Sequence, residues 1–187
     1  MKTLGETKKK VLSLIEELNP KSPVLTDDED IAAKFNYVAN IILFEMARYK
    51  KIPKYAELPV TEGQLLTFED IESAVGYEIY QIDKIRGVCY EAKANGTVFK
   101  ILEAGTAEID VFVYPESITA KTKDSYEFEV SRDVLEVMVY GIAGDLLKSD
   151  VSSGYGAVYT NRYESMKQML DPRYQMGSIC VEGGVDI

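Results

Sequence analysis

The stretch "MVYGIAGDLLKSD", Met138 to Asp150, lies in an expected helix that starts after Ser131, a favourable N-cap residue. Apolar residues recur at helical spacing along one face of this helix: Leu135, Met138, Val139, Ile142 and Leu146. Val137, Gly141 and Gly144 lie on a different side. The helix is therefore apolar over much of its circumference, which indicates burial between two packing partners.

The two glycines are unfavourable for helix formation, since each costs about 1 kcal/mol relative to alanine in a helix interior. Gly141 and Gly144 are one turn apart, beside Val137. Without a Cβ atom, such positions let a second backbone approach closely. We expect another helix to pack against this side. The sequence leaves open whether that helix belongs to the same chain.

Two further helices are expected before residue 51. The first covers Glu6–Leu18 and ends at the proline-containing NPKSP. The second begins at the N-cap Thr26, where Glu29 completes a capping box, and runs to about Lys50. Its apolar stripe is made of Ile31, Phe35, Val38, Ile42, Met46 and Tyr49.

From Tyr77 the apolar period changes to two, which is typical of strands. Four runs show it: YEIYQI, IRGVCYEA, TVFKIL and EIDVFVY. Asn95-Gly96 between the second and third predicts a type I′ hairpin turn. SITAK (117–121) and YEFEV (126–130) are candidates for two more short strands, for a total of five or six. Residues 53–76 show a mixed pattern with no clear apolar period, and a turn or short helix is expected at TFEDIESAV.

A last helix is expected over Ala157–Leu170, connected to the preceding one by a short break that favours an antiparallel hairpin. The fold class is therefore α+β, with terminal helices around a central antiparallel, β-sandwich-like insert. We predict a helical domain of residues 1–60 plus 131–170, a β domain of residues 61–130, and a flexible C-terminal arm of residues 171–187.

Charge argues against sequence-specific DNA binding. The net charge is −10: residues 1–60 hold ten Lys/Arg against nine Asp/Glu, a balance of +1, and residues 61–187 hold eleven against twenty-two, a balance of −11. This excess of acid repels a phosphate backbone. The start lacks the features of a signal peptide, and no run reaches the roughly 18 apolar residues of a membrane span. A chain that is soluble and intracellular when made is expected.

The residues suggest no catalytic, cofactor or metal site. Histidine is absent, which removes Ser-His and Cys-His nucleophiles. Gly154-x-Gly156 follows a helix, and no lysine completes a phosphate loop. The acids at 27–30 lack the spacing of a calcium loop and suit a helix N-terminus. We expect the carboxylate pairs Glu108/Asp110 and Glu127/Glu129 to lie on the solvent-exposed faces of strands. A buried thiol is expected at Cys89 and a tail thiol at Cys180.

Tyrosine is enriched, with thirteen residues and no tryptophan. Its large apolar ring with a polar tip is favoured at protein interfaces. Several tyrosines cluster towards the end of the chain, near the two glycines. The candidate interface residues are Val137, Tyr140, Gly141, Gly144, Tyr155, Tyr159, Tyr163, Arg173 and Tyr174.

Several stretches of the chain have the sequence pattern of one known class of proteins. They are Tyr114-Pro115, ITAKTKD, a strand ending in FEV, the helix with YGIAGDLLKSD, and YTNRYESM, together with the earlier LTDDEDIAAKFNYVANIILFEMA. They cover about half of the chain. In these stretches the chain resembles small virion proteins of tailed bacteriophages and prophages, the head–tail connector (adaptor, or neck) class. The central β insert departs from the purely helical members, which leaves open which neck or tail component this is.

The resemblance implies a non-enzymatic structural subunit. Such subunits form homo-oligomeric rings, usually dodecamers, that dock under the portal protein and receive tail or neck proteins. DNA passes through the ring without sequence-specific binding, and no membrane is involved. The implied location is the virion neck, after synthesis in the cytoplasm of the bacterial host.

Two alternatives from other classes stay open. One is a β-sandwich ligand-binding module of the carbohydrate-binding type, which needs an exposed aromatic platform; Tyr77, Tyr80 and Tyr90 are the candidates. The other is an enzyme that uses carboxylates, for which the sequence shows no organised site.

Overall fold

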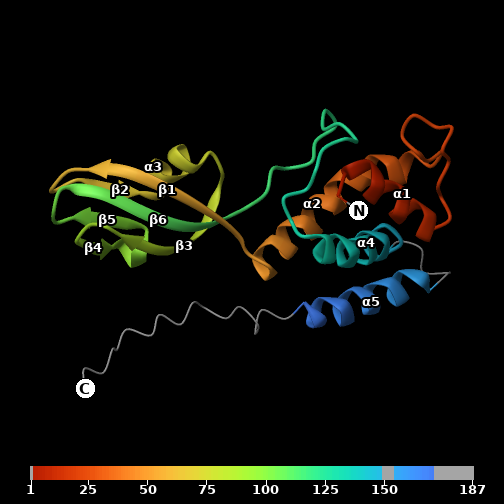
Figure 1. Ribbon diagram of the computed structural model, residues 1–187. Coiled ribbons are helices and arrows are strands. Elements are labelled where there is room, and N and C mark those ends of the chain that lie inside the picture. Colours follow the sequence, from red (N-terminus) through yellow and green to blue (C-terminus); the bar gives the residue numbers. More distant parts are fainter. Residues whose placement is uncertain (1, 149–153, 171–187) are drawn as a thin grey trace, which may run out of the picture.

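The computed structural model describes residues 2–148 and 154–170 and shows an α+β fold, as expected. Figure 1 shows two lobes that follow one another along the long axis of the molecule. The helical lobe contains α1 (Leu4–Leu14), α2 (Glu29–Tyr49), α4 (Arg132–Leu146) and α5 (Tyr155–Met169). The β lobe, residues 52–113, contains six strands and the short helix α3 (Phe68–Val75). The chain crosses between the lobes twice, directly after α2 and again before α4.

Helix α2 has the predicted apolar stripe. Five of its six residues are buried and Tyr49 is half-buried. The helix ends at Tyr49, one residue before the predicted end. Its N-cap differs from the prediction: Asp28 caps the helix, because its carboxylate accepts hydrogen bonds from the N–H groups of Asp30 and Ile31. Thr26 lies two residues before this N-cap, and its hydroxyl accepts a hydrogen bond from the Asp28 N–H.

Helix α1 is shifted relative to the predicted Glu6–Leu18. It begins at Leu4, because Thr3 and Glu6 form a capping box, and it ends at Leu14. Glu16 has a positive φ of 64°, which a helix cannot contain, so the chain has turned before Leu18. Ile15 and Leu18, the last apolar residues of the predicted helix, therefore pack against the core from the turn that follows α1.

The strands pair antiparallel in two three-stranded sheets, of order β1-β6-β3 and β2-β5-β4. Their bounds are β1 Ile52–Val60, β2 Leu65–Thr67, β3 Ile79–Arg86, β4 Tyr90–Lys93, β5 Val98–Ile101 and β6 Gly105–Val113. Inward-facing residues of both sheets join one hydrophobic cluster. Asn95 and Gly96 both have positive φ, as the predicted type I′ turn requires. The connection is longer than a two-residue hairpin, because the last strand pair is Lys93 with Val98 and the single 3-10 turn η1 (Ala94–Gly96) lies between them, with Ala94 also at positive φ.

Strand β1 corrects the predicted domain boundary. Residues 52–60 were assigned to the helical domain, but they pair with β6 over their whole length, so the sheet region begins at Ile52. Pro53 and Pro59 obscured the strand in the sequence. Proline cannot donate a ladder hydrogen bond, yet β1 is an edge strand and tolerates it.

The segment of residues 114–131, here called the return segment, corrects a second expectation. SITAK and YEFEV form no strands; the segment has only the isolated bridge between Thr3 and Glu127. Its carbonyls instead accept hydrogen bonds from the start of α1: the Leu4 N–H donates to Tyr126 and the Gly5 N–H to Asp124, each at 2.9 Å. The return segment thus satisfies donors that the first turn of a helix leaves unpaired.

Asn40 of α2 holds the middle of the return segment. Its side-chain amide donates to the Ile118 carbonyl at 2.8 Å, and its side-chain carbonyl accepts from the Ile118 N–H at 2.7 Å. Ile118 is buried, so water cannot replace these bonds. One side chain therefore pairs both polar groups of a buried peptide segment.

We expect Asn40→Ala to lower the free energy of unfolding by about 1–3 kcal/mol, because the Ile118 N–H and carbonyl lose their partners in a buried place. Urea unfolding followed by circular dichroism measures the change. Asn36→Ala is the matched control: Asn36 lies one turn earlier on α2 and bonds to no described residue through its side chain. Equal effects of the two substitutions would show that the bonds to Ile118 contribute nothing.

Candidate interaction surface

Helix α4 is the centre of the helical lobe. It contacts α1, α2 and α5, and ten of its fifteen residues are buried. Figure 1 shows its ribbon between those of α2 and α5. The helix is buried on two sides, as its largely apolar circumference predicted.

The glycine side of α4 faces α5 of the same chain. A Cβ atom on Gly144 would lie 2.7 Å from the Thr160 hydroxyl oxygen and 3.0 Å from the Thr160 backbone nitrogen. A Cβ atom on Gly141 would lie 2.9 Å from the ring of Tyr163 and 3.2 Å from Ile42 of α2. Both distances to α5 are too short for a side chain. The close approach predicted from the sequence therefore exists, and its partner is intramolecular.

This packing changes the status of four candidate interface residues. Val137, Gly141, Gly144 and Tyr163 are buried beneath α5 or within the bundle, so they are not part of the surface. The Tyr163 hydroxyl points into the lobe and donates to the Met46 sulfur at 3.4 Å. Helical periodicity identified an apolar side correctly, but it cannot distinguish a surface for a partner from one that the same chain covers.

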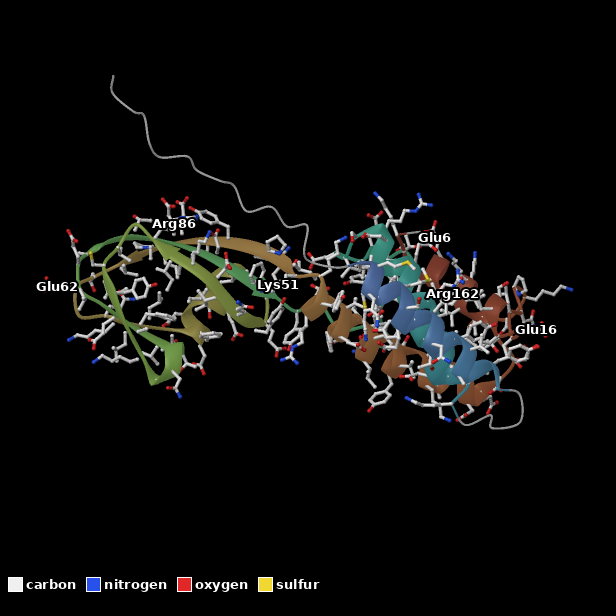
Figure 2. The ribbon with its side chains drawn as sticks, turned by 90° about the horizontal axis from the view of Figure 1, so that it is seen from below. Glu6, Glu16, Lys51, Glu62, Arg86 and Arg162 are labelled. Carbon is white, nitrogen blue, oxygen red and sulfur yellow. The ribbon has the colours of Figure 1, made fainter. Side chains whose placement is uncertain are left out.

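The remaining candidate tyrosines lie at the end of the lobe where α5 begins. Tyr155 is 61% exposed and stacks on Tyr159, whose hydroxyl donates to the Leu14 carbonyl at 2.7 Å. Tyr140 is half-buried beneath the guanidinium of Arg162, which is labelled in Figure 2. Arg173 and Tyr174 lie outside the described residues.

Two exposed apolar stripes lie on the helical lobe, and the sequence analysis identified only Tyr155 among their residues. The α5 stripe consists of Tyr155, Val158 and Met169, which are 61%, 59% and 80% exposed. The α2 stripe consists of Tyr37 and Ile41, which are 71% and 43% exposed. Because α4 lies between the two helices, the stripes lie on different sides of the lobe. A signal was present: Tyr37 and Ile41 follow one another at i, i+4, on a line separate from the buried stripe.

The two lobes meet at a third surface feature, an open groove of about 680 Å³. We call it the junction groove; it is lined by Ile41, Phe44, Glu45, Arg48, Tyr49, Glu78 and Tyr114. Tyr114 is its central ring, because Phe44 and Tyr80 pack against it with centroids at 5.5 and 4.9 Å. The Arg48 guanidinium lies over the same ring at 5.5 Å.

Beside the groove, polar contacts tie the lobes together. Glu129 of the return segment accepts hydrogen bonds from Lys54 of β1 at 3.0 Å and from the Tyr77 hydroxyl at 2.6 Å. Burial disfavours the charged form of Lys54, but the bonds to Glu129 and Tyr77 outweigh it and raise the pKa of Lys54. The bond to Glu129 also raises the pKa of Tyr77. These groups are therefore held protonated and act as structural donors.

The tyrosines proposed as a carbohydrate platform do not form one. Tyr77 is bonded to Glu129, and the Tyr80 hydroxyl donates to the Ala47 carbonyl at 3.0 Å. Tyr80 and Tyr90 do line a common open depression of about 390 Å³ between the sheets, but Tyr77 does not. The Tyr90 ring meets Phe99 edge-on. No flat face of three exposed rings results.

The remaining candidates for chemistry are engaged in structure. Asp110 and Glu108 face Arg86, at 2.9 and 3.6 Å. Gly154 caps α5 with a positive φ of 65°, as a helix-to-helix turn requires. Within residues 2–148 and 154–170, no group of three potential metal-ligating side chains comes together, and no helix has the length and apolar composition needed to cross a bilayer.

The expected burial of Cys89 is wrong. The thiol is exposed on the loop before β4, because the strand that YEIYQI begins ends at Arg86 and the chain turns there, with Gly87 at a φ of 79°. Cys180 lies outside the described residues. The sequence matches no protein-family model and shows no significant match to a curated protein.

We expect Gly144→Leu to destabilise the protein by at least about 1–3 kcal/mol through overpacking against the Thr160 backbone, although helix propensity alone favours leucine. Thermal or urea unfolding measures the difference. Ala33→Leu adds similar bulk at an exposed position of α2 and should change stability by no more than about 0.5 kcal/mol. Stability of Gly144→Leu equal to that of the parent would refute the close contact.

Burial and the neighbouring Glu45 carboxylate raise the pKa of Tyr163 above its ordinary value. The unfolded chain ionises this group at about pH 10, whereas the folded chain keeps it protonated. Its contribution to stability is therefore complete below about pH 10 and decreases as the pH rises, by up to about 1.4 kcal/mol per pH unit. Tyr163→Phe should reduce this alkaline loss, measured by urea unfolding at about pH 8 and about pH 11. Met46→Leu removes the hydrogen-bond acceptor but keeps the phenol, and should retain the slope.

Proposed function

We propose that the protein is a non-enzymatic structural subunit of a tailed-phage virion, a head–tail connector that forms a ring between portal and tail around the DNA channel. One observation carries this proposal: the helical lobe has exposed apolar stripes on two different sides. Isolated apolar residues on a surface are ordinary, but aligned ones on otherwise well-packed helices are typical of protein interfaces.

Two unlike surfaces on one subunit are what a closed ring needs. In a cyclic ring each subunit binds its neighbour head-to-tail, so one surface contacts a different surface of the next copy. The α5 stripe and the α2 stripe satisfy this requirement. A two-fold dimer would use only one of them and leave the other exposed to water.

The resemblance to connectors concerns the helical lobe and the return segment. YGIAGDLLKSD lies mainly in α4, YTNRYESM lies in α5, and the motif around FEMA ends α2. These are the helices that carry the core and both stripes. The β lobe is the part that departs from purely helical connectors, and we propose that it projects from the ring to contact neck or tail proteins.

The charge distribution suits a position near DNA without affinity for it. Residues 52–113 hold five Lys/Arg against eleven Asp/Glu, a net charge of −6. Glu62 lies at the end of this lobe farthest from the helices (Figure 2). A phosphate backbone is repelled by such a surface and can slide past it. The partners we propose are other copies of this chain, usually twelve in a ring, the portal protein, and tail or neck proteins.

The test is assembly. We expect the full chain, alone or mixed with the portal protein of the same genome, to form rings that are visible by negative-stain electron microscopy and by mass photometry. Both conditions are needed, because a ring can require the portal as a template. Strictly monomeric protein that never joins portal particles would refute the proposal.

A matched pair of variants locates the contact. Val158→Glu puts a charge into the α5 stripe and should reduce incorporation into rings by about tenfold or more, because desolvating that charge costs more than about 1.4 kcal/mol. Leu102→Glu makes the same change at a 48%-exposed residue of the β lobe and should assemble normally. Unchanged circular dichroism shows that both variants fold.

A further inference from the structure

A second pocket lies between α1, α2, the loop that joins them and the return segment, with a volume of about 220 Å³. We call it the α1–α2 pocket. Its wall is largely apolar, because the buried residues Leu12, Ile31 and Phe35 line it. Two alanines, Ala32 and Ala120, also line it, and neither has a side chain long enough to fill the space. No residue of the two exposed stripes belongs to its lining.

The α1–α2 pocket also contains a buried hydrogen-bond donor without an acceptor. Thr26 lines the pocket and is 2% exposed. Its hydroxyl oxygen accepts from the Asp28 N–H at 3.1 Å, but no acceptor for the hydroxyl proton is present among the described residues. The half-buried side-chain amide of Asn36 lines the pocket too, and it bonds to no described residue. Because buried polar groups are normally paired, these two groups favour a ligand that brings a hydrogen-bond acceptor.

The charge of the α1–α2 pocket is already balanced. Lys8 is the charged residue among the described residues that line it. Its Nζ atom lies 2.9 Å from the Asp124 carboxylate and 6.0 Å from the centre of the Phe35 ring. An anionic ligand would have to displace Asp124 from Lys8 and lose its own hydration beside apolar side chains. The pocket therefore favours an uncharged ligand.

We propose that the α1–α2 pocket binds an uncharged small molecule that consists of one substituted aromatic ring with a hydrogen-bond acceptor. The volume fits, since an apolar cavity of about 150 Å³ holds benzene and this pocket of about 220 Å³ leaves space for a short substituent. The aromatic ring packs against Leu12 and Phe35, and its acceptor takes the proton of the Thr26 hydroxyl. A rigid ring loses little conformational freedom when it binds. This inference goes beyond the proposed function and does not depend on assembly of subunits.

The experiment titrates the full chain with benzyl alcohol and with toluene and follows the amide chemical shifts by nitrogen–proton NMR. We expect saturable shifts in α1, α2 and the return segment, with a Kd for benzyl alcohol of about 1 mM or lower. Ala32→Leu fills the pocket and should weaken both ligands by about tenfold or more. Ala33→Leu adds the same side chain at the neighbouring exposed position and should leave both affinities unchanged. Ala120→Leu fills the pocket from an exposed position of the return segment, and it replaces Ala32→Leu if circular dichroism shows that the latter is unfolded.

A second comparison tests the hydrogen bond and the preference for an uncharged ligand. Thr26→Val removes the hydroxyl but keeps the shape, and should weaken benzyl alcohol about fivefold relative to toluene. Thr26→Ser keeps the hydroxyl and should keep the ratio of the two affinities. Any effect of these variants on the fold acts on both ligands, so the ratio isolates the hydroxyl. Benzoate should bind at least about tenfold more weakly than benzyl alcohol, because its charge is desolvated without a free cation.

Several outcomes would overturn the proposal. They are the absence of saturable shifts, equal affinities in the filled-pocket variant and Ala33→Leu, equal weakening of both ligands by Thr26→Val, and tighter binding of benzoate than of benzyl alcohol. Assembly with the portal protein is scored without these ligands. Failure of ligand binding is therefore distinguishable from failure of the proposed function.

Discussion

The close contact between Gly144 of α4 and the backbone of Thr160 is the constraint on which the helical lobe depends. Because no side chain fits between them, α5 lies directly on α4 and covers Gly141 as well. Helix α4 is then enclosed by α1, α2 and α5. Because α4 is enclosed, a partner of the helical lobe contacts the outer sides of the surrounding helices, among them the exposed apolar residues of α2 and α5.

The second constraint is the return segment between β6 and α4. It contributes almost no regular secondary structure, yet its backbone pairs with α1, with Asn40 of α2 and, through the side chain of Glu129, with the β lobe. These contacts fix where the β lobe sits on the helices. The junction groove exists because the return segment brings Tyr114, and the residue before β3 brings Glu78, against α2.

Features that depend on neighbouring residues were predicted well. The buried stripe of α2, the Asn95-Gly96 turn, and the two-sided apolar helix from 131 onward follow from local periodicity and backbone preference. Errors arose where alternatives of similar local energy compete: Asp28 caps α2 in place of Thr26, and β1 carries prolines that only an edge strand tolerates. YEFEV alternates like a strand, but the start of α1 takes its backbone hydrogen bonds.

The sequence by itself determined the α+β class, the surplus of acid, and the requirement that some backbone pack against Gly141 and Gly144. Only the tertiary structure decided that this backbone is the chain's own α5, so that Val137 and Tyr163 are core and Val158 and Tyr37 are surface. The reason is physical. Periodicity reports which side of a helix avoids water, but what covers that side depends on contacts between residues far apart in the chain.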